Sequence, residues 1–205
     1  MNHSKSRAGI PLRFRRSPWY HLPGRASGRT LEASEPVTGA VLRQAREDAM
    51  TIAKRLKAHL DAEGVRFDTV DHPRTATASE SAEAAHVPGD RLAKTVVVHL
   101  EDGYVLAVVP SSHRVDLGDL QELLGRRLGL AAETEVGELF EDCDVGAAPP
   151  IGPAYGVAVV LDRSLNGLDR VWFEGGDHRT LVSIAGADFD RLLRDARKGS
   201  FSHSV

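Results

Sequence analysis

The chain has 205 residues, 41% of them hydrophobic, so it can bury one sizeable core and its length favours a single domain. No run approaches the ~18 to 20 apolar residues of a membrane-spanning helix, and no apolar secretory segment opens the chain, so we expect a cytoplasmic protein with no membrane partner. The single cysteine, Cys143, excludes an internal disulfide framework and a cysteine-rich zinc site. We interpret it as a small buried hydrophobe rather than a nucleophile.

Charge is unevenly distributed along the chain. Seven of the 26 basic residues lie in the first 30 positions, which hold no acidic residue, so residues 31–205 carry 19 basic against 29 acidic side chains. This balance argues against a broad nucleic-acid-binding face and predicts no DNA partner, because phosphate binding needs clustered Lys and Arg. Contact with RNA phosphates would have to come from a local patch.

The N-terminal region differs in composition from the rest. Residues 1–40 mix Arg, Ser, Gly and Pro without helical or strand periodicity, and we predict a disordered basic extension there. It could be an arm that reaches for nucleic acid, but we favour an incorrectly assigned start, with Met50 as the alternative. Val41 and Leu42 could extend the next helix backwards, so the question stays open. We assign residues 41–198 to the folded domain and residues 199–205 to a short tail.

The first predicted elements precede a central hairpin. The first is a helix that begins at the N-cap Thr51, presents apolar residues on one face and ends at Gly64. Alternating apolar residues over 65–70 then predict a half-buried strand. The residues 77–80, Thr-Ala-Ser-Glu, form a capping box that predicts a short helix over 82–86.

The central hairpin is the most informative pattern in the sequence. Two apolar runs, over 91–100 and 104–110, are separated by a short loop that ends in Gly103, which can supply a positive φ. Neither run alternates with polar residues, so we expect the hairpin to be buried on both faces. Lys94 enters this core and must end in a cavity or reach its mouth, which makes it the first candidate for chemistry.

The second half of the chain completes an α/β pattern. The remaining predicted elements are, in chain order, a helix capped by Asp116 and ended by Gly125, a helix opened by Thr134, a Gly- and Pro-rich segment over 143–153, strands over 156–161, 170–173 and 180–184, and a helix over 188–197. We predict one compact α/β domain with a curved, barrel-like mixed sheet surrounded by helices, and not a doubly wound nucleotide fold.

Several common active sites are absent from the sequence. There is no GxxxxGK[ST], GxGxxG, GxSxG or HExxH motif. His86, His99, His113 and His178 are scattered without paired ligand spacing, so we expect neither a metal nor a cofactor.

Three features remain as candidates for a site. They are Lys94 near the start of a buried strand, the loop 146–152, whose free amides at Gly146, Ala147 and Ala148 could face a developing oxyanion, and the turn 175–178, Gly-Gly-Asp-His, which carries His178. Each alone has an ordinary explanation: a solvated lysine, a rigid turn and a hairpin connection.

Together these segments resemble a known family. The segments 71–73 and 77–80, residues 93–98, the loop 146–152 and residues 171–178 resemble, in this order along the chain, motifs of the YbaK/EbsC (YbaK/ProX) aminoacyl-tRNA editing-domain family. This family is related to the insertion domain of bacterial prolyl-tRNA synthetase. The resemblance extends from about residue 50 to about residue 194.

The resemblance implies a trans-acting deacylase that hydrolyses the ester of mischarged tRNA, with the tRNA acceptor end as partner, a synthetase as a further candidate partner, and no cofactor. Lys94 matches the family's essential lysine, Gly146 matches the loop glycine that would contact the carbonyl, and His178 matches a histidine present in some members. The implied substrate-binding residues are Thr95, Ala147, Ala148, Pro149, Gly175, Gly176 and His113. Pro149 replaces a serine common in relatives, and Thr95 replaces the asparagine of alanine-specific members, which argues against alanine as the substrate. The alternative is a non-catalytic module of this fold that binds tRNA ends or a synthetase.

Overall fold

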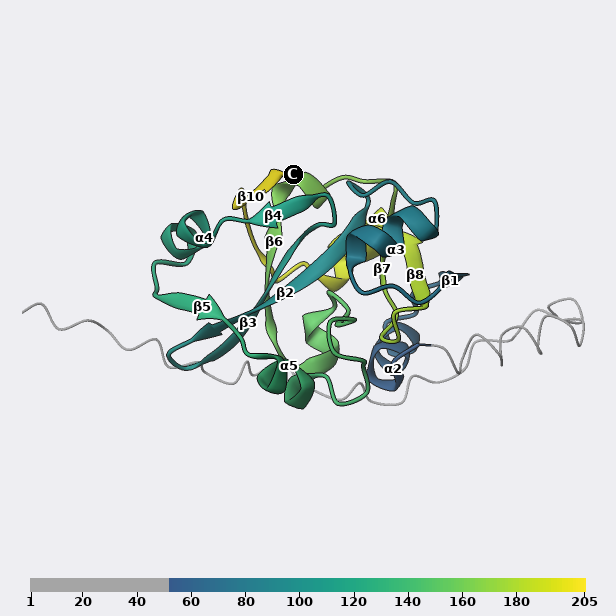
Figure 1. Cartoon of the computed structure of the whole chain (residues 1–205), viewed down its shortest axis with the longest axis horizontal. Helices are drawn as coiled ribbons and strands as arrows, with labels where there is room; N and C mark the ends of the chain where they lie inside the picture. Colours follow the sequence, from purple (N-terminus) through teal and green to yellow (C-terminus); the bar gives the residue numbers. More distant parts are fainter. Residues whose placement is uncertain (1–51) are drawn as a thin grey trace, which may run out of the picture. The chain divides into compact units, whose positions relative to one another are not determined.

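The described residues form a mixed α/β unit. The computed structural model describes residues 52–205 (Figure 1), so the predicted extension, its boundary at residue 40 and the Thr51 cap lie outside the described residues. The helices are α2 (Lys54–Ala62), α3 (Ala78–Ala84), α4 (Leu117–Leu124), α5 (Glu133–Leu139) and α6 (Gly186–Leu192), with short 3-10 turns η1 (Gly152–Tyr155) and η2 (Arg163–Leu165). No helix within residues 52–205 combines the length and the apolar character needed to cross a membrane.

The strands form one large mixed sheet and one small one. The strands are β1 (Phe67–Asp71), β2 (Leu92–Leu100), β3 (Gly103–Pro110), β4 (His113–Val115), β5 (Leu128–Leu130), β6 (Ala158–Asp162), β7 (Arg170–Glu174), β8 (Thr180–Ala185), β9 (Arg197–Gly199) and β10 (Ser202–Ser204). The large sheet has the order β1-β8-β7-β2-β3-β6-β9, β5 pairs with β2, and β10 pairs with β4. The predicted α/β class and mixed sheet are confirmed. The hydrogen-bonded order of the described strands ends at β1 and β9, so closure into a barrel is not confirmed.

The central hairpin has the predicted form. Strands β2 and β3 are antiparallel and pair Lys94 with Val109 and Leu100 with Gly103. Gly103 has φ 142°, as the tight connection requires. Residues Val105 to Pro110 are all buried, so both faces of the hairpin are covered, as expected.

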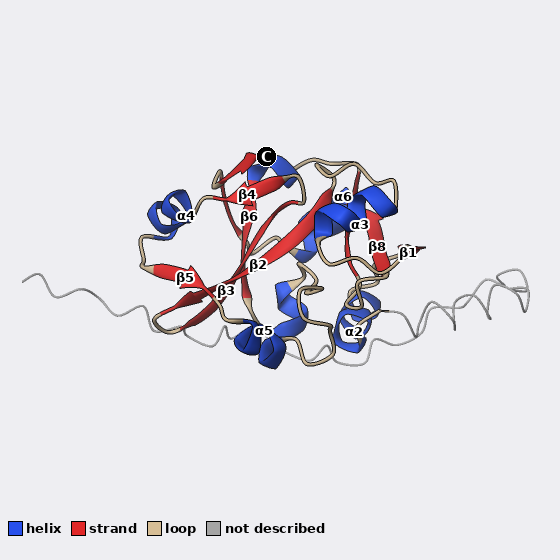
Figure 2. Ribbon diagram, in the orientation of Figure 1, coloured by secondary structure: helices blue, strands red, loops and turns tan. Residues whose placement is uncertain are grey.

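Helices cover both faces of the large sheet (Figure 2). On one face, α2, α6 and η1 pack on a cluster that includes Ala93 and Val97 of β2. On the other face, α4 packs over Val98 and α3 packs over Leu92. Side chains alternate between the faces of a strand, so Lys94 lies on the α3 face together with Leu92, whereas Thr95 lies on the opposite face with Ala93.

Local signals identified the caps of two helices. Thr77 and Glu80 form the predicted capping box of α3, but the helix spans Ala78–Ala84 and not 82–86: it begins directly after its cap and ends before His86, which has φ 55°. Asp116 accepts hydrogen bonds from the first amides of α4, and Gly125 ends that helix at φ 66°.

Other boundaries were predicted wrongly. Helix α5 begins at Glu133 and not with a Thr134 cap, because the Glu135 carboxylate accepts the Ala132 N–H at 2.7 Å and fixes the first turn earlier. The last helix ends at Leu192, well before residue 197, because Arg197 opens β9 and pairs with β6. The three-residue strands β4, β5, β9 and β10 were missed, and β10 lies within residues 199–205, where a tail was expected.

Candidate active site

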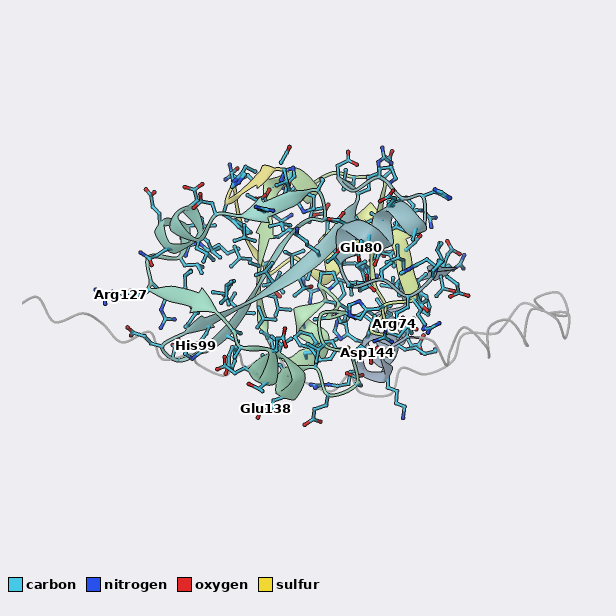
Figure 3. The ribbon with its side chains drawn as sticks, in the orientation of Figure 1. Arg74, Glu80, His99, Arg127, Glu138 and Asp144 are labelled. Atoms are coloured by element: carbon cyan, nitrogen blue, oxygen red, sulfur yellow. The ribbon has the colours of Figure 1, made fainter. Side chains whose placement is uncertain are left out.

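Three loop segments meet at the end of the β7–β8 hairpin. We call them the His72 segment (72–77), the Gly146 loop (143–148) and the His178 turn (175–179). The Asp144 N–H donates to the Gly176 carbonyl at 2.7 Å, and the His72 N–H donates to the Arg179 carbonyl at 2.8 Å. Arg74 and Asp144 form an exposed ion pair at 3.0 Å between the His72 segment and the Gly146 loop (Figure 3). The structure thus brings the predicted Gly146 and His178 segments together.

The His178 turn holds its histidine in an unusual backbone conformation. Asp177 accepts hydrogen bonds from the amides of Arg179 and Thr180 at 2.9 and 2.8 Å, and this closes the turn tightly. His178 consequently has φ 56°, which costs free energy for a residue with a side chain. The ring is buried, and its Nε2 lies 2.8 Å from the Val145 carbonyl oxygen. Since a carbonyl can only accept, Nε2 carries the proton.

This hydrogen bond fixes the amide of Gly146. The Val145 carbonyl and the Gly146 N–H belong to one planar trans peptide, so the N–H points away from His178. Gly146 is exposed and has φ 91°, and its N–H forms no hydrogen bond with another described residue. The Ala148 N–H is likewise unpaired among the described residues. The expectation of three free amides was wrong at Ala147, whose N–H donates to the Asp144 carbonyl at 3.0 Å.

Lys94 lies next to this region, since β2 pairs with β7, but its side chain forms no hydrogen bond or ion pair with the described residues of either loop. Its ammonium donates to the Ser111 carbonyl at 3.1 Å. Burial and, secondarily, the positive charge of Arg114 lower the pKa of Lys94. Neither cation forms an ion pair with a carboxylate within residues 52–205. Two like charges without a counterion form a local site suited to an anion.

Of the seven predicted substrate-binding residues, Thr95 and His113 lie outside the two loops. Thr95 faces away from Lys94, and its Oγ1 is buried without a partner. His113 lies in β4 and pairs through Nδ1 with the Ser202 hydroxyl at 2.9 Å. The other five are buried in the Gly146 loop, or next to it, and in the His178 turn: Ala147, Ala148, Pro149, Gly175 and Gly176.

Sequence reasoning missed a buried glutamate beside the His178 turn. Glu174 ends β7, is 4% exposed and accepts the Ser81 hydroxyl of α3 at 2.6 Å. Burial raises its pKa, while the Ser81 hydrogen bond and the charges of His178 and His72 act in the opposite direction. The signal was present in the sequence, because a carboxylate that closes an apolar Val-Trp-Phe run is as unusual as a lysine that opens one.

Two other candidate chemistries find little support in the geometry. Burial raises the pKa of the Cys143 thiol to about 11, and its Sγ lies 3.4 Å from the Tyr155 hydroxyl, so it is a poor nucleophile. It is only partly buried but packs against the core, close to the expected role. The described histidines, cysteine and carboxylates contain no group of three arranged to hold a metal ion.

Comparison with known proteins identifies the class to which this fold and site belong. The family model for the aminoacyl-tRNA editing domain matches residues 72–192, and the chain belongs to this family. The matched range contains Lys94, the Gly146 loop and the His178 turn.

Two kinds of relative specify the likeness further. A proline--tRNA ligase of Xanthomonas oryzae pv. oryzae (strain MAFF 311018) is 32% identical over 146 residues, and one of Xanthomonas campestris pv. campestris (strain 8004) is 26% identical over 144 residues. Each alignment covers 70% of this chain but 25% of the ligase, so the chain spans about a quarter of these relatives. A solved structure described as a proposed trans-editing enzyme for prolyl tRNA synthetase is 30% identical with a TM-score of 0.64, and the match covers 74% of this chain and 97% of that one.

Proposed function

We propose that this protein is a trans-acting deacylase that hydrolyses the ester bond of mischarged tRNA in the cytoplasm. The observation that carries the proposal is the exposed, unpaired Gly146 amide, aimed by the His178 hydrogen bond to the preceding carbonyl. Such a preorganised donor stabilises the oxyanion that forms when water adds to an ester carbonyl. Membership of the editing family, and the structural likeness that covers 97% of a proposed trans-editing enzyme for prolyl tRNA synthetase, support the same reaction.

In the proposed mechanism, the protein positions the ester and does not form a covalent intermediate. Water adds to the carbonyl carbon, the bond from that carbon to the ribose oxygen breaks, and a proton passes to the ribose oxygen, which leaves a free amino acid and tRNA. Gly146 stabilises the oxyanion, and His178 keeps its amide in position. Lys94, with Arg114 close by, binds a phosphate of the terminal nucleotides. An aminoacyl ester is already activated, so positioning and oxyanion donors are sufficient without a triad or a metal.

The test is a panel of tRNAs, each charged with a wrong amino acid, incubated with wild type, Lys94→Met and the control Lys54→Met, which removes an exposed lysine of α2. We expect wild type and the control to release amino acid from at least one member of the panel. Lys94→Met should be at least about tenfold slower, as expected for loss of a charge-assisted phosphate contact. Equal release by all three proteins would contradict the role of Lys94, and no release by wild type would contradict the function.

A non-catalytic module that binds tRNA ends or a synthetase is the second candidate. The excess of acidic residues over 31–205 favours it, because strong independent tRNA binding needs positive charge. Salt-sensitive retention of charged tRNA without release of amino acid would identify this function.

A further inference from the structure

Three buried polar atoms next to the site have no hydrogen-bond partner. Glu174, His72 and His178 are 4%, 7% and 5% exposed. Oε1 of Glu174 accepts from Ser81, but its Oε2 is unpaired, as are Nε2 of His72 and Nδ1 of His178. Buried polar atoms are rarely left unpaired, so three such atoms in one region need a physical explanation.

In each histidine ring, the hydrogen bond made by one nitrogen determines whether the other, unpaired nitrogen is a donor or an acceptor. Nδ1 of His72 lies 2.8 Å from the Pro73 carbonyl oxygen, so this nitrogen carries a proton, and in the neutral form of the ring Nε2 is an acceptor. Nε2 of His178 donates to the Val145 carbonyl, so in the neutral form of this ring Nδ1 is an acceptor as well. When both rings are neutral and Glu174 is ionised, the group consists of three acceptors and no donor.

The sheet brings these side chains to one place. Strands β7 and β8 pair Glu174 with Leu181, β1 and β8 pair Val70 with Leu181, and the backbone of His72 continues the latter ladder. Glu174, the last residue of β7, and His72, just after β1, therefore lie on either side of β8, on the face that α3 covers. The Thr75 N–H donates to the His178 carbonyl at 3.2 Å and the His72 N–H donates to the Arg179 carbonyl at 2.8 Å, so the backbones of the two histidine segments run side by side at this end of the sheet.

We propose that this cluster, Glu174 with His72 and His178, binds the α-ammonium group of the aminoacyl moiety of the substrate. The inference rests on the proposed deacylase function. An ammonium carries a positive charge and three N–H donors, which complement one carboxylate oxygen and two bare ring nitrogens. A hydroxyl or an apolar group would leave most of these acceptors unpaired.

The cluster is connected to the proposed oxyanion site through a single side chain. Nδ1 of His178 belongs to the cluster, while its Nε2 holds the peptide that presents the Gly146 N–H. In an α-amino ester the ammonium and the carbonyl are separated by one carbon, so both must be bound close to one another. The acceptors are closed to solvent in this structure, and the His72 segment and the Gly146 loop that flank them are joined by the exposed Arg74–Asp144 pair. Parting of these two segments gives the ammonium its entry.

Two other occupants fit less well. A metal ion needs its nitrogen and oxygen ligands at about 2.0–2.2 Å, and the described residues offer no group of three so placed, whereas the acceptors of an ammonium lie farther from its nitrogen, at about 2.7–2.9 Å. The Lys94 ammonium donates to the Ser111 carbonyl, and none of the ion pairs within residues 52–205 joins it to Glu174.

The test compares the aminoacyl-tRNA that wild type hydrolyses fastest with the same tRNA after N-acetylation, which removes the positive charge and two N–H donors. Wild type should prefer the free amine by about tenfold or more in kcat/KM. Glu174→Gln, which keeps an acceptor for Ser81, should lose this preference by slowing only the free-amine substrate. Glu83→Gln, an exposed change on α3, should behave as wild type.

Each outcome separates the proposals. Wild-type hydrolysis without any preference for the free amine would overturn the ammonium site and leave the deacylase function intact. Loss of both rates in equal proportion in Glu174→Gln, with an unchanged melting temperature, would do the same. If Glu174→Gln does not fold, His72→Gln provides the same comparison with one acceptor altered. Absence of release from every substrate by wild type would overturn the function itself.

Discussion

The Gly146 amide can be tested by adding a single methyl group. Gly146→Ala places a Cβ 3.3 Å from Cε1 and 3.4 Å from Nε2 of His178, a contact tighter than most real Cβ contacts. The ring or the loop must shift by a few tenths of an ångström, and the His178 to Val145 hydrogen bond, now 2.8 Å, lengthens or tilts. The same change forces alanine to φ 91°, which costs about 1–2 kcal/mol of folding stability.

The effect on catalysis should exceed the effect on stability. Loss of one oxyanion donor typically slows the chemical step about 10²–10³-fold, so single-turnover deacylation by Gly146→Ala should slow by up to this factor. The matched control is Gly125→Ala, where φ is 66° and a Cβ would meet no atom within 4 Å. Both variants should unfold at lower urea concentration, but only Gly146→Ala should lose activity. If Gly146→Ala hydrolyses substrate as fast as Gly125→Ala, the oxyanion role of this amide is refuted.

Two further predictions concern Cys143 and Asp162. Burial raises the pKa of Cys143 to about 11, so iodoacetamide at pH 7.5 should alkylate this thiol far more slowly in the folded protein than in urea, as followed by intact mass. The variant Cys143→Ala should deacylate its substrate at the wild-type rate. Rapid alkylation of the folded protein would contradict this prediction. Burial alone would raise the pKa of Asp162, but hydrogen bonds from the Phe201 N–H and from Ser164 lower it overall. The ionised Asp162 therefore contributes its full stabilisation above the pKa that it has in the unfolded chain, and this stabilisation is lost as the pH falls through the pKa of the folded state. Asp162→Ala should therefore cost about 2–4 kcal/mol in urea unfolding at pH 7 and less at pH 3, and an equal cost at both would count against this assignment.

The parts of the fold that the sequence predicted are those with local causes. The capping box at Thr77 and Glu80 needs two side chains three residues apart, and the α4 boundaries need only Asp116 and Gly125. Three-residue strands have no such signal. Strand β10 exists because Arg114 and its neighbours in β4 pair with it across a long stretch of chain, and sequence periodicity does not encode that contact.

The candidate site was predictable only in part, for a similar reason. Gly146 and His178 were singled out by glycine and proline patterns, but the hydrogen bond that links them depends on the positive φ of His178, which Asp177 imposes. Which amides of the Gly146 loop are free also depends on the tertiary structure. The Ala147 N–H is not available to a ligand because it donates to the Asp144 carbonyl. Glu174 was overlooked because a carboxylate at the end of a strand is usually solvated.

The arrangement of charge across β2 and β7 gives the two proposed binding roles a common basis. Leu92 pairs with Trp172 and Ala93 with Phe173, so Lys94 and Glu174 follow as neighbours on the same face of the sheet. Opposite charges so placed would ordinarily form an ion pair, yet Lys94 bonds to the Ser111 carbonyl and Glu174 to the Ser81 hydroxyl. Each charge is thus held by a neutral partner and remains available to a ligand. An aminoacyl-tRNA end carries a phosphate anion and an ammonium cation, so one molecule can satisfy both, and a ligand with only one of these charges would leave the other side of the site uncompensated.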